Sequence, residues 1–472
     1  MPYADYGQKD EFRSGWRERA GRGGRLTVEL AYLLIGCSVL FVAAWRRGWT
    51  VPLWAALLIA LGARAVVAVL ASGYTPQDVA ECFRDAGNLV LAGRDPMTQL
   101  PRYEWNFLPV MPYVFAGEVR SGLPWPLAAK VAPIAADLVT TALLSRFRPA
   151  PTAGGGGWSR SAQRGGGGWP RFPRTPGAPG APLLYALCPL AILISAVHGQ
   201  VEPVALAMGT WALLLARRGA AGRTGLLAGL AIATKTWPVL LVLGMLRDTP
   251  VSRWWRLLAS LAVAPLAALL TVRLFLHDSM RAALGVLVSY RSMFGWWGWS
   301  GMLHLLGLAG TGYTGPGVAE FQRVGTVIVI AAMGAVLLAR WADGVALTAA
   351  VLLAFLAVTA GFGPQYLVWP VPCLILLRWS WGLAFTVLAG CYGMFVYLVA
   401  IPYPGLTWAG DVERWACLPV IMAAVLAVRD GVRAIPATAR HARVGRAGRP
   451  GWRSPLPVPA SPARTAPRHG RV

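Results

Sequence analysis

Repeated apolar runs of roughly 17–22 residues, separated by polar loops, occupy most of the chain. A helix of about 20 apolar residues is long enough to cross the hydrocarbon core of a bilayer. The runs are continuous rather than alternating, which excludes a transmembrane β-barrel. Charged residues make up only 14% of the 472 residues, against about 25% in soluble domains. The sequence therefore predicts an all-α polytopic membrane protein.

We expect a bundle of about 11–13 transmembrane helices, with loops that carry amphipathic helices. Segment 225–246 is apolar but has basic residues at both ends and Lys235-Thr236-Trp237-Pro238 in its middle. This pattern favours a broken hairpin of two short helices. The other expected spans lie at 26–44, 51–72, 124–145, 182–197, 203–216, 257–276, 323–339, 345–361, 366–380, 382–400 and 415–428.

The formal net charge of +24 comes mostly from arginine. Such a charge would suit nucleic-acid binding, but the cations cluster in short loops and in the C-terminal tail. Short cationic loops are cytoplasmic in membrane proteins. We therefore expect the arginine-rich segments 146–181 and 429–472 in the cytoplasm, and no nucleic-acid partner. The Gly, Pro and Arg content of segment 146–181 cannot bury a core and, like the basic, proline-rich tail, favours disorder.

This orientation gathers several loops on the outer, extracytoplasmic side of a cell membrane: 73–123, 198–202, 277–322, 362–366 and 401–414. The chain then divides into a polar N-terminal segment, a first group of spans with the outer loop 73–123, a Gly/Pro/Arg-rich cytoplasmic linker, the remaining bundle with the outer loop 277–322, and a basic cytoplasmic tail. Their bounds are 1–25, 26–145, 146–181, 182–428 and 429–472.

One conflict in this topology concerns the N-terminus. If both 26–44 and 51–72 cross the membrane, the N-terminus lies outside, although it is slightly basic. The alternative is that 26–44 does not fully span.

Three of the acids in the outer loop, Asp78, Glu81 and Asp85, stand close together. Thr75-Pro76 has the pattern of a helix cap followed by a first helical residue, and Gly93 is a typical C-terminal residue. In such a helix the three acids share one face. Asp78 is then either a capping carboxylate beside a solvated acidic face, or a general base or cation-organising carboxylate at the membrane surface.

Two further polar groups lie next to apolar runs. His198-Gly199-Gln200-Val201-Glu202 ends one span and begins the next; it is either an ordinary polar turn or a set of hydrogen-bonding groups for a sugar. Lys235 lies in the middle of an apolar segment, where an ionisable side chain is functional by default. The alternative is that its side chain reaches the inner interface.

The remaining candidates come from later loops. Gln365 and Tyr366 open a span, and alone could form part of an aromatic belt at the interface. Arg291, in the outer loop, is either a solvated side chain or a phosphate ligand. Trp296, Trp297 and Trp299 are expected to be interface anchors, or a platform for a lipid chain or sugar. The six cysteines show neither disulfide nor metal spacing.

The order of these groups follows a recurring pattern of four motifs. An Asp-x-Asp segment with Gly-x-x-Pro and an aromatic-Pro run corresponds to Thr75-Pro76-Gln77-Asp78, Gly93-Arg94-Asp95-Pro96 and Tyr103 to Pro109. An x-Asn-Pro span and polar turn corresponds to Leu187-Cys188-Pro189 and His198-Gly199-Gln200. Gly-x-x-x-Gly with Lys-x-x-Pro corresponds to Gly225 to Gly229, Lys235 and Pro238, and the last motif is Gln365-Tyr366-Leu367-Val368-Trp369.

In this order the chain resembles the GT-C glycosyltransferases, which use polyprenyl-phosphate sugars as donors. It is most similar to the mannosyltransferases that include the GPI mannosyltransferase I catalytic subunit, and to bacterial polyprenol-phosphate-mannose-dependent relatives. Two residues depart from the pattern: Pro76 replaces the first acid of Asp-x-Asp, and Cys188 replaces Asn. The departure at Pro76 leaves open whether a divalent cation takes part, and no other cofactor is expected.

The resemblance implies a mannosyltransferase that acts on an extracytoplasmic glycan or glycolipid acceptor with inversion. Asp78 would be the catalytic base. The implied substrate-binding residues are Glu81, Asp85, His198, Gln200, Glu202, Lys235, Arg291, Gln365 and Tyr366. The same architecture also suits a transporter or flippase for a lipid-linked sugar, or a non-catalytic subunit of a glycosyltransferase complex. No internal inverted repeat is evident, and the polar groups crowd one side, which favours a transferase.

Overall fold

The computed structural model describes residues 9–100, 107–147, 180–289, 294–312, 317–403 and 406–433. Within these residues the regular elements are helices, and no strand is formed. Seven helices are long and apolar enough to cross a membrane, or eight if one bent pair counts as a span. The expected all-α polytopic membrane fold is therefore confirmed. The long helices are α1 (Lys9–Arg47), α2 (Leu53–Leu70), α6 (Trp125–Leu144), α12 (Trp254–Phe275), α15 (Val318–Leu338), α19 (Thr407–Arg433) and α18 (Ser380–Phe395), which reaches the length of a span together with the π-helical turn η7 (Val396–Ala400).

Several expected spans are shorter or broken, which is why fewer full-length spans are found than the 11–13 expected. α9 (Glu202–Arg217) has 16 residues and α16 (Gly344–Val358) has 15. The segment Pro364–Leu377, which contains η6 (Pro364–Val368) and α17 (Val371–Leu377), is shorter still. α16 is apolar and buried almost all round, as a helix enclosed by other helices should be.

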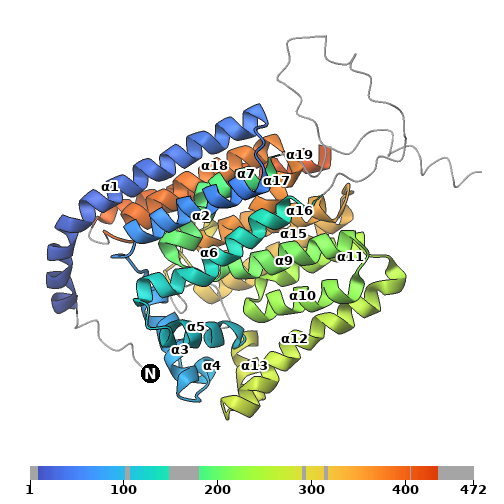
Figure 1. The fold of residues 1–472 in the computed structure, drawn as a ribbon, viewed down its shortest axis with the longest axis horizontal. Coiled ribbons are helices and arrows are strands. Elements are labelled where there is room, and N and C mark those ends of the chain that lie inside the picture. Colours follow the sequence, from blue (N-terminus) through green and yellow to red (C-terminus); the bar gives the residue numbers. More distant parts are fainter. Residues whose placement is uncertain are drawn as a thin grey trace, which may run out of the picture. The chain divides into compact units, whose positions relative to one another are not determined.

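Four short helices lie together at one end of the bundle (Figure 1). Three of them come from the loop between α2 and α6, and the fourth follows α12. Their bounds are Arg84–Leu91 (α3), Pro96–Gln99 (α4), Val110–Arg120 (α5) and Met280–Ser289 (α13). The hydroxyl of Thr98 in α4 donates to Asp278 just before α13, so the two loops are joined directly.

The segment expected to be a broken hairpin does fold into separate helical pieces. These are α10 (Ala221–Thr234), the 3₁₀ turn η4 (Trp237–Leu241) and α11 (Val242–Asp248). At one end of the segment, Arg253 donates to the carbonyl of Gly219 at 3.1 Å. At the other, Asp248 accepts from the backbone N–H of Gly344 at 2.7 Å.

The neighbouring Arg217–Asp343 pair, at 2.7 Å, joins the C-terminal end of α9 to the same region. Both ends of the hairpin therefore lie at the same end of the bundle. Lys235, in extended backbone between α10 and η4, lies at its apex.

The Gly-x-x-x-Gly motif explains how α10 packs along α12, its neighbour in Figure 1. A Cβ atom on Gly225 would lie 2.1 Å from the carbonyl oxygen of Leu257, and one on Gly229 would lie 2.1 Å from that of Leu261. Only glycine allows this approach of the two backbones. The motif therefore fixes α10, and with it the position of Lys235.

A buried ion pair supports a bend between α7 (Ala181–Leu187) and the following helix, which turn by 52° at Cys188. At the bend, the carbonyls of Tyr185 and Ala186 accept hydrogen bonds from the guanidinium of Arg64 at 3.4 and 3.1 Å. Arg64 Nε also contacts Asp137 Oδ2 at 2.7 Å. The bent segment continues as α8 (Pro189–Ile192) and the π-helical turn η3 (Leu193–His198), so this pair supports the helix that carries His198.

Candidate active site

Asp78 begins the π-helical turn η1 (Asp78–Phe83), which leads into α3. Its carboxylate accepts the backbone N–H of the next residue, Val79, at 2.9 Å. Its other partners come from a distant turn: His198 Nε2 lies 3.1 Å from both carboxylate oxygens, and Gln200 Nε2 donates at 2.6 Å. The side chain of Asp78 is still 40% exposed. It is therefore fixed in place and accessible.

The turn that holds Asp78 has a defined geometry. Gly199 has φ +80°, and a Cβ atom there would lie 3.3 Å from the carbonyl oxygen of Ala129, so glycine suits the position. Gln200 Oε1 accepts the N–H of Val201 at 3.0 Å, which directs the amide nitrogen of Gln200 toward Asp78. His198 is buried, and its Nδ1 lies 2.8 Å from the hydroxyl of Tyr397.

Lys235 forms a buried ion pair with Glu202, the first residue of α9. Its ammonium nitrogen also lies 4.7 Å from the ring centre of Phe107 and 5.4 Å from that of Tyr366. These ring faces attract the cation. The second oxygen of Glu202, Oε2, is buried without a hydrogen-bond partner in the described part of the chain. The pair is therefore an incompletely satisfied polar group beside Asp78.

An aromatic stack supports the ring of Tyr366. Its ring packs on Trp369 at a centroid distance of 4.4 Å, and Trp369 packs on Trp237 at 4.3 Å. Trp237 follows the Lys235 apex by two residues, so the stack joins the hairpin to η6.

Electrostatics keep Asp78 ionised. Burial alone would raise the pKa of its carboxyl group, but the neighbouring His198, the N–H of Val79 and the charge of Lys235 together hold that pKa below its usual range. A carboxylate in this state can accept a proton or a hydrogen bond, but cannot donate one.

Six residues expected in the site are brought together by these contacts: Asp78, His198, Gln200, Glu202, Lys235 and Tyr366. The other three described candidates are placed differently. Glu81 and Asp85 are exposed, and Glu81 accepts from Gln77. Gln365 folds back against Gly363.

The expectation that Asp78, Glu81 and Asp85 share one face assumed the period of an α-helix. The wider π-helical turn rotates Asp78 toward His198 while Glu81 stays in solvent. Arg291 and most of the Tyr103–Pro109 motif lie outside the described residues.

The sequence analysis missed Tyr397 and the Arg64–Asp137 pair. Tyr397 lies within an apolar run and could not be distinguished from an ordinary core aromatic residue. Arg64 lies in the expected span 51–72, so the reasoning that identified Lys235, an ionisable group in an apolar segment, could have found it.

No group of three or more His, Cys, Asp or Glu side chains that could hold a metal ion occurs in the described ranges. The nitrogen atoms that face Asp78 belong to His198 and Gln200, and both serve as donors to the carboxylate.

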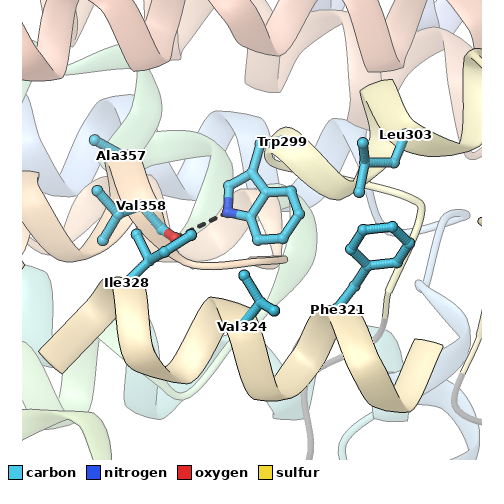
Figure 2. A pocket seen from close by; sticks show the side chains of 7 residues that line it. All are labelled: Trp299, Leu303, Phe321, Val324, Ile328, Ala357 and Val358. Carbon is cyan, nitrogen blue, oxygen red and sulfur yellow. Dashed lines mark hydrogen bonds between the residues drawn. The ribbon is translucent and has the colours of Figure 1, made fainter. Parts of the chain in front are cut away.

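A separate apolar pocket of about 360 Å³ lies between α14 (Trp299–Leu305), α15 and α16. Figure 2 shows its lining, in which Trp299 Nε1 donates to the carbonyl of Val358 at 2.8 Å. Trp299, expected to be an interface anchor or a platform for a lipid chain or sugar, lines this pocket, whereas Asp78 and the expected substrate-binding residues do not.

Comparison with known families defines the class of protein. Residues 119–370, more than half of the chain, match a family of glycosyltransferases of the GT-C type. The chain belongs to glycosyltransferase family 87. No curated protein is similar enough to match it. The matched range includes His198, Lys235 and Tyr366 but begins after Asp78, so the assignment of Asp78 to the site rests on its contacts.

Proposed function

We propose that this membrane glycosyltransferase moves a sugar, mannose, from a polyprenyl-phosphate donor to an extracytoplasmic glycan or glycolipid. The observation that carries the proposal is the Asp78 carboxylate, which is held by His198 and Gln200 and stays partly exposed; its neighbours lower its pKa. A carboxylate in this setting suits a general base. The choice of mannose rests on the sequence resemblance alone.

In the proposed reaction the acceptor hydroxyl gives its proton to Asp78 as its oxygen attacks the anomeric carbon. The bond from that carbon to the phosphate oxygen breaks, and polyprenyl phosphate leaves with the bonding electrons. A single displacement inverts the anomeric configuration. Family membership favours this transferase chemistry over the flippase alternative.

The leaving phosphate gains negative charge, which a nearby cation would stabilise. Lys235 is the cation that the described site offers. It gives one N–H to Glu202, which leaves two of the three ammonium hydrogens for a ligand. Arg291 remains a second proposed cation. The groups proposed to orient the sugar or acceptor are Glu81, Asp85, His198, Gln200, Glu202, Gln365 and Tyr366.

Two further features support the proposal. The bundle end opposite the site carries arginines such as Arg217 and Arg253, and the positive-inside rule would make that end, with the C-terminal tail, cytoplasmic. The site would then face outward across a cell membrane. The apolar lining of the Trp299 pocket provides the surface chemistry that a polyprenyl chain needs.

The test is a transfer assay with purified protein in lipid nanodiscs. Polyprenyl-phosphate mannose carries the label, polyprenyl-phosphate glucose is offered in parallel, and release of polyprenyl phosphate is measured with a defined glycolipid acceptor. Asp78→Asn should lower transfer on the order of 10²–10⁴-fold. Glu320→Gln, which removes an exposed acid in the first turn of α15, outside the proposed site, is the control and should stay close to wild type. Normal transfer by a folded Asp78→Asn protein would exclude Asp78 as the base, and faster use of the glucose donor would exclude mannose.

A further inference from the structure

Three helical segments in the described residues are π-helical: Asp78–Phe83 (η1), Leu193–His198 (η3) and Val396–Ala400 (η7). They come from three distant parts of the chain. Asp78 is the first residue of η1, His198 is the last of η3, and Tyr397 is the second of η7. π-Helical turns are rare and occur mostly at functional sites, and each of these three turns carries one residue of the contacts around Asp78.

The side chains of Tyr397, His198 and Asp78 contact one another in that order. The hydroxyl of Tyr397 lies 2.8 Å from His198 Nδ1, and His198 Nε2 lies 3.1 Å from each oxygen of Asp78. The two rings meet nearly edge-on, at a centroid distance of 4.9 Å. His198 and Tyr397 are both buried, so neither ring can turn freely.

Few hydrogen atoms are available for the hydrogen bonds among Tyr397, His198 and Asp78. The Asp78 carboxylate accepts only, so His198 Nε2 must carry the hydrogen between them. Among the described residues, Tyr397 has His198 as the hydrogen-bond partner of its hydroxyl. The arrangement that uses every hydrogen therefore has Tyr397 O–H donating to an unprotonated Nδ1, and Nε2–H donating to Asp78. Such a contact selects one tautomer of a neutral imidazole.

We propose that Tyr397 is a positioning residue for the transfer reaction: its hydroxyl holds His198 in the Nε2–H tautomer, and His198 in turn orients the Asp78 carboxylate toward the acceptor hydroxyl. The inference rests on the proposed role of Asp78 as the base. Tyr397 need not touch substrate. Its removal should change the orientation and acidity of Asp78 rather than substrate binding.

The test compares Tyr397→Phe with Tyr392→Phe. Tyr392 lies five residues earlier, in α18, which leads directly into η7; it is also buried, and its hydroxyl has no hydrogen-bond partner among the described residues. Both variants remove one buried hydroxyl from a neighbouring position. Tyr397→Phe should lower kcat about 10–100-fold, as removal of an orienting partner does elsewhere, with little change in the KM for donor. Tyr392→Phe should keep wild-type kcat.

The pH dependence provides a readout that simple loss of packing would not change. Without the Tyr397 hydroxyl, His198 can adopt the other tautomer and no longer donates to Asp78. The pKa of Asp78 should rise, and the acidic limb of kcat/KM should move to higher pH. The other titratable groups near Asp78 or Tyr397 are Lys235, Tyr74, Glu202, Glu413 and Tyr392; all are retained in Tyr397→Phe, and the control variant replaces only Tyr392.

Two results would each overturn the proposal. One is an unshifted acidic limb in Tyr397→Phe. The other is an additive loss when Tyr397→Phe is combined with His198→Ala, because a residue that acts through His198 cannot matter once His198 is absent.

A measurement without substrate separates this inference from the proposed function. Nitrogen-15 shifts of the imidazole, assigned with His198→Gln, should show Nε2–H in the wild type and a tautomer mixture in Tyr397→Phe. An unchanged tautomer would contradict the proposal even if transfer is confirmed. A change in tautomer would support it even if the donor proves to be another sugar lipid.

Discussion

Two buried ion pairs in this protein differ in how completely their polar atoms are used. In the Arg64–Asp137 pair, both side chains are fully buried. The guanidinium nitrogens of Arg64 reach Asp137 and backbone carbonyls, and the second oxygen of Asp137 accepts from the hydroxyl of Tyr185 at 2.7 Å. In the Lys235–Glu202 pair, one carboxylate oxygen has no partner within the described residues.

From this difference we infer that the Arg64–Asp137 pair serves the fold and that the Lys235–Glu202 pair serves the reaction. A network whose members satisfy one another has nothing left to offer a ligand, and it rigidifies the fold. A pair with spare hydrogens and a spare acceptor suits a polar substrate, in agreement with the role proposed for Lys235. Burial alone would not distinguish the two pairs, because both lie almost completely inside the bundle.

The largest expected effect on stability comes from breaking the Arg64–Asp137 pair. Asp137→Ala leaves the Arg64 guanidinium buried and unpaired, which should destabilise the protein by about 3–5 kcal/mol. The measurement is denaturant or thermal unfolding in detergent, with transfer activity corrected for the folded fraction. Asp137→Asn keeps hydrogen-bonding atoms and should cost less. If Asp137→Ala is as stable as wild type, the pair does not support the bend at Cys188.

Removal of the Lys235–Glu202 pair should have the opposite effect, a loss of transfer with little change in stability. The double variant Lys235→Gln/Glu202→Gln removes both charges, so no unpaired ion remains in the site. We expect transfer to fall on the order of 10²–10³-fold because the leaving phosphate loses its cation, while thermal stability changes little. Wild-type transfer by the double variant would remove Lys235 from the mechanism. A loss of folding comparable to Asp137→Ala would show that both pairs are structural.

The sequence was most informative about the arrangement of loops and least informative about contacts. Charge and connectivity were enough to group the loops that carry Asp78, His198 and Tyr366 at one end of the bundle. The contact between Asp78 and His198 joins residues 120 positions apart, and no local pattern encodes it. The direction of Asp78 depends on a π-helical turn, and the sequence pattern was interpreted with an α-helical period. Arg64 and Asp137 each look isolated in their own apolar runs, and only packing shows that they form a pair.

A smaller effect is expected where the fold positions Lys235 without touching it. Gly229→Ala would place a Cβ atom 2.1 Å from the carbonyl oxygen of Leu261, so α10 and α12 must separate, at a cost of about 1–3 kcal/mol. Transfer per folded molecule should also fall, because Lys235 ends α10. Gly222→Ala is the matched control in the same helix: nothing lies within 4 Å of its added Cβ, and alanine should be neutral or stabilising by up to about 1 kcal/mol. Equal unfolding midpoints for both variants would contradict the close packing of α10 on α12.

The smallest effect is expected from removing divalent cations. Pro76 stands where a second acid could have joined Asp78, and the oxygens of Asp78 already accept from Val79, His198 and Gln200. A cation would have to displace these donors. We therefore expect treatment with EDTA to change the transfer rate less than about twofold, far below the effect of Asp78→Asn. A large loss of transfer that Mg²⁺ or Mn²⁺ restores would show that Asp78 organises a cation. The polar groups of the site that lack a partner would then serve a metal as well as a sugar.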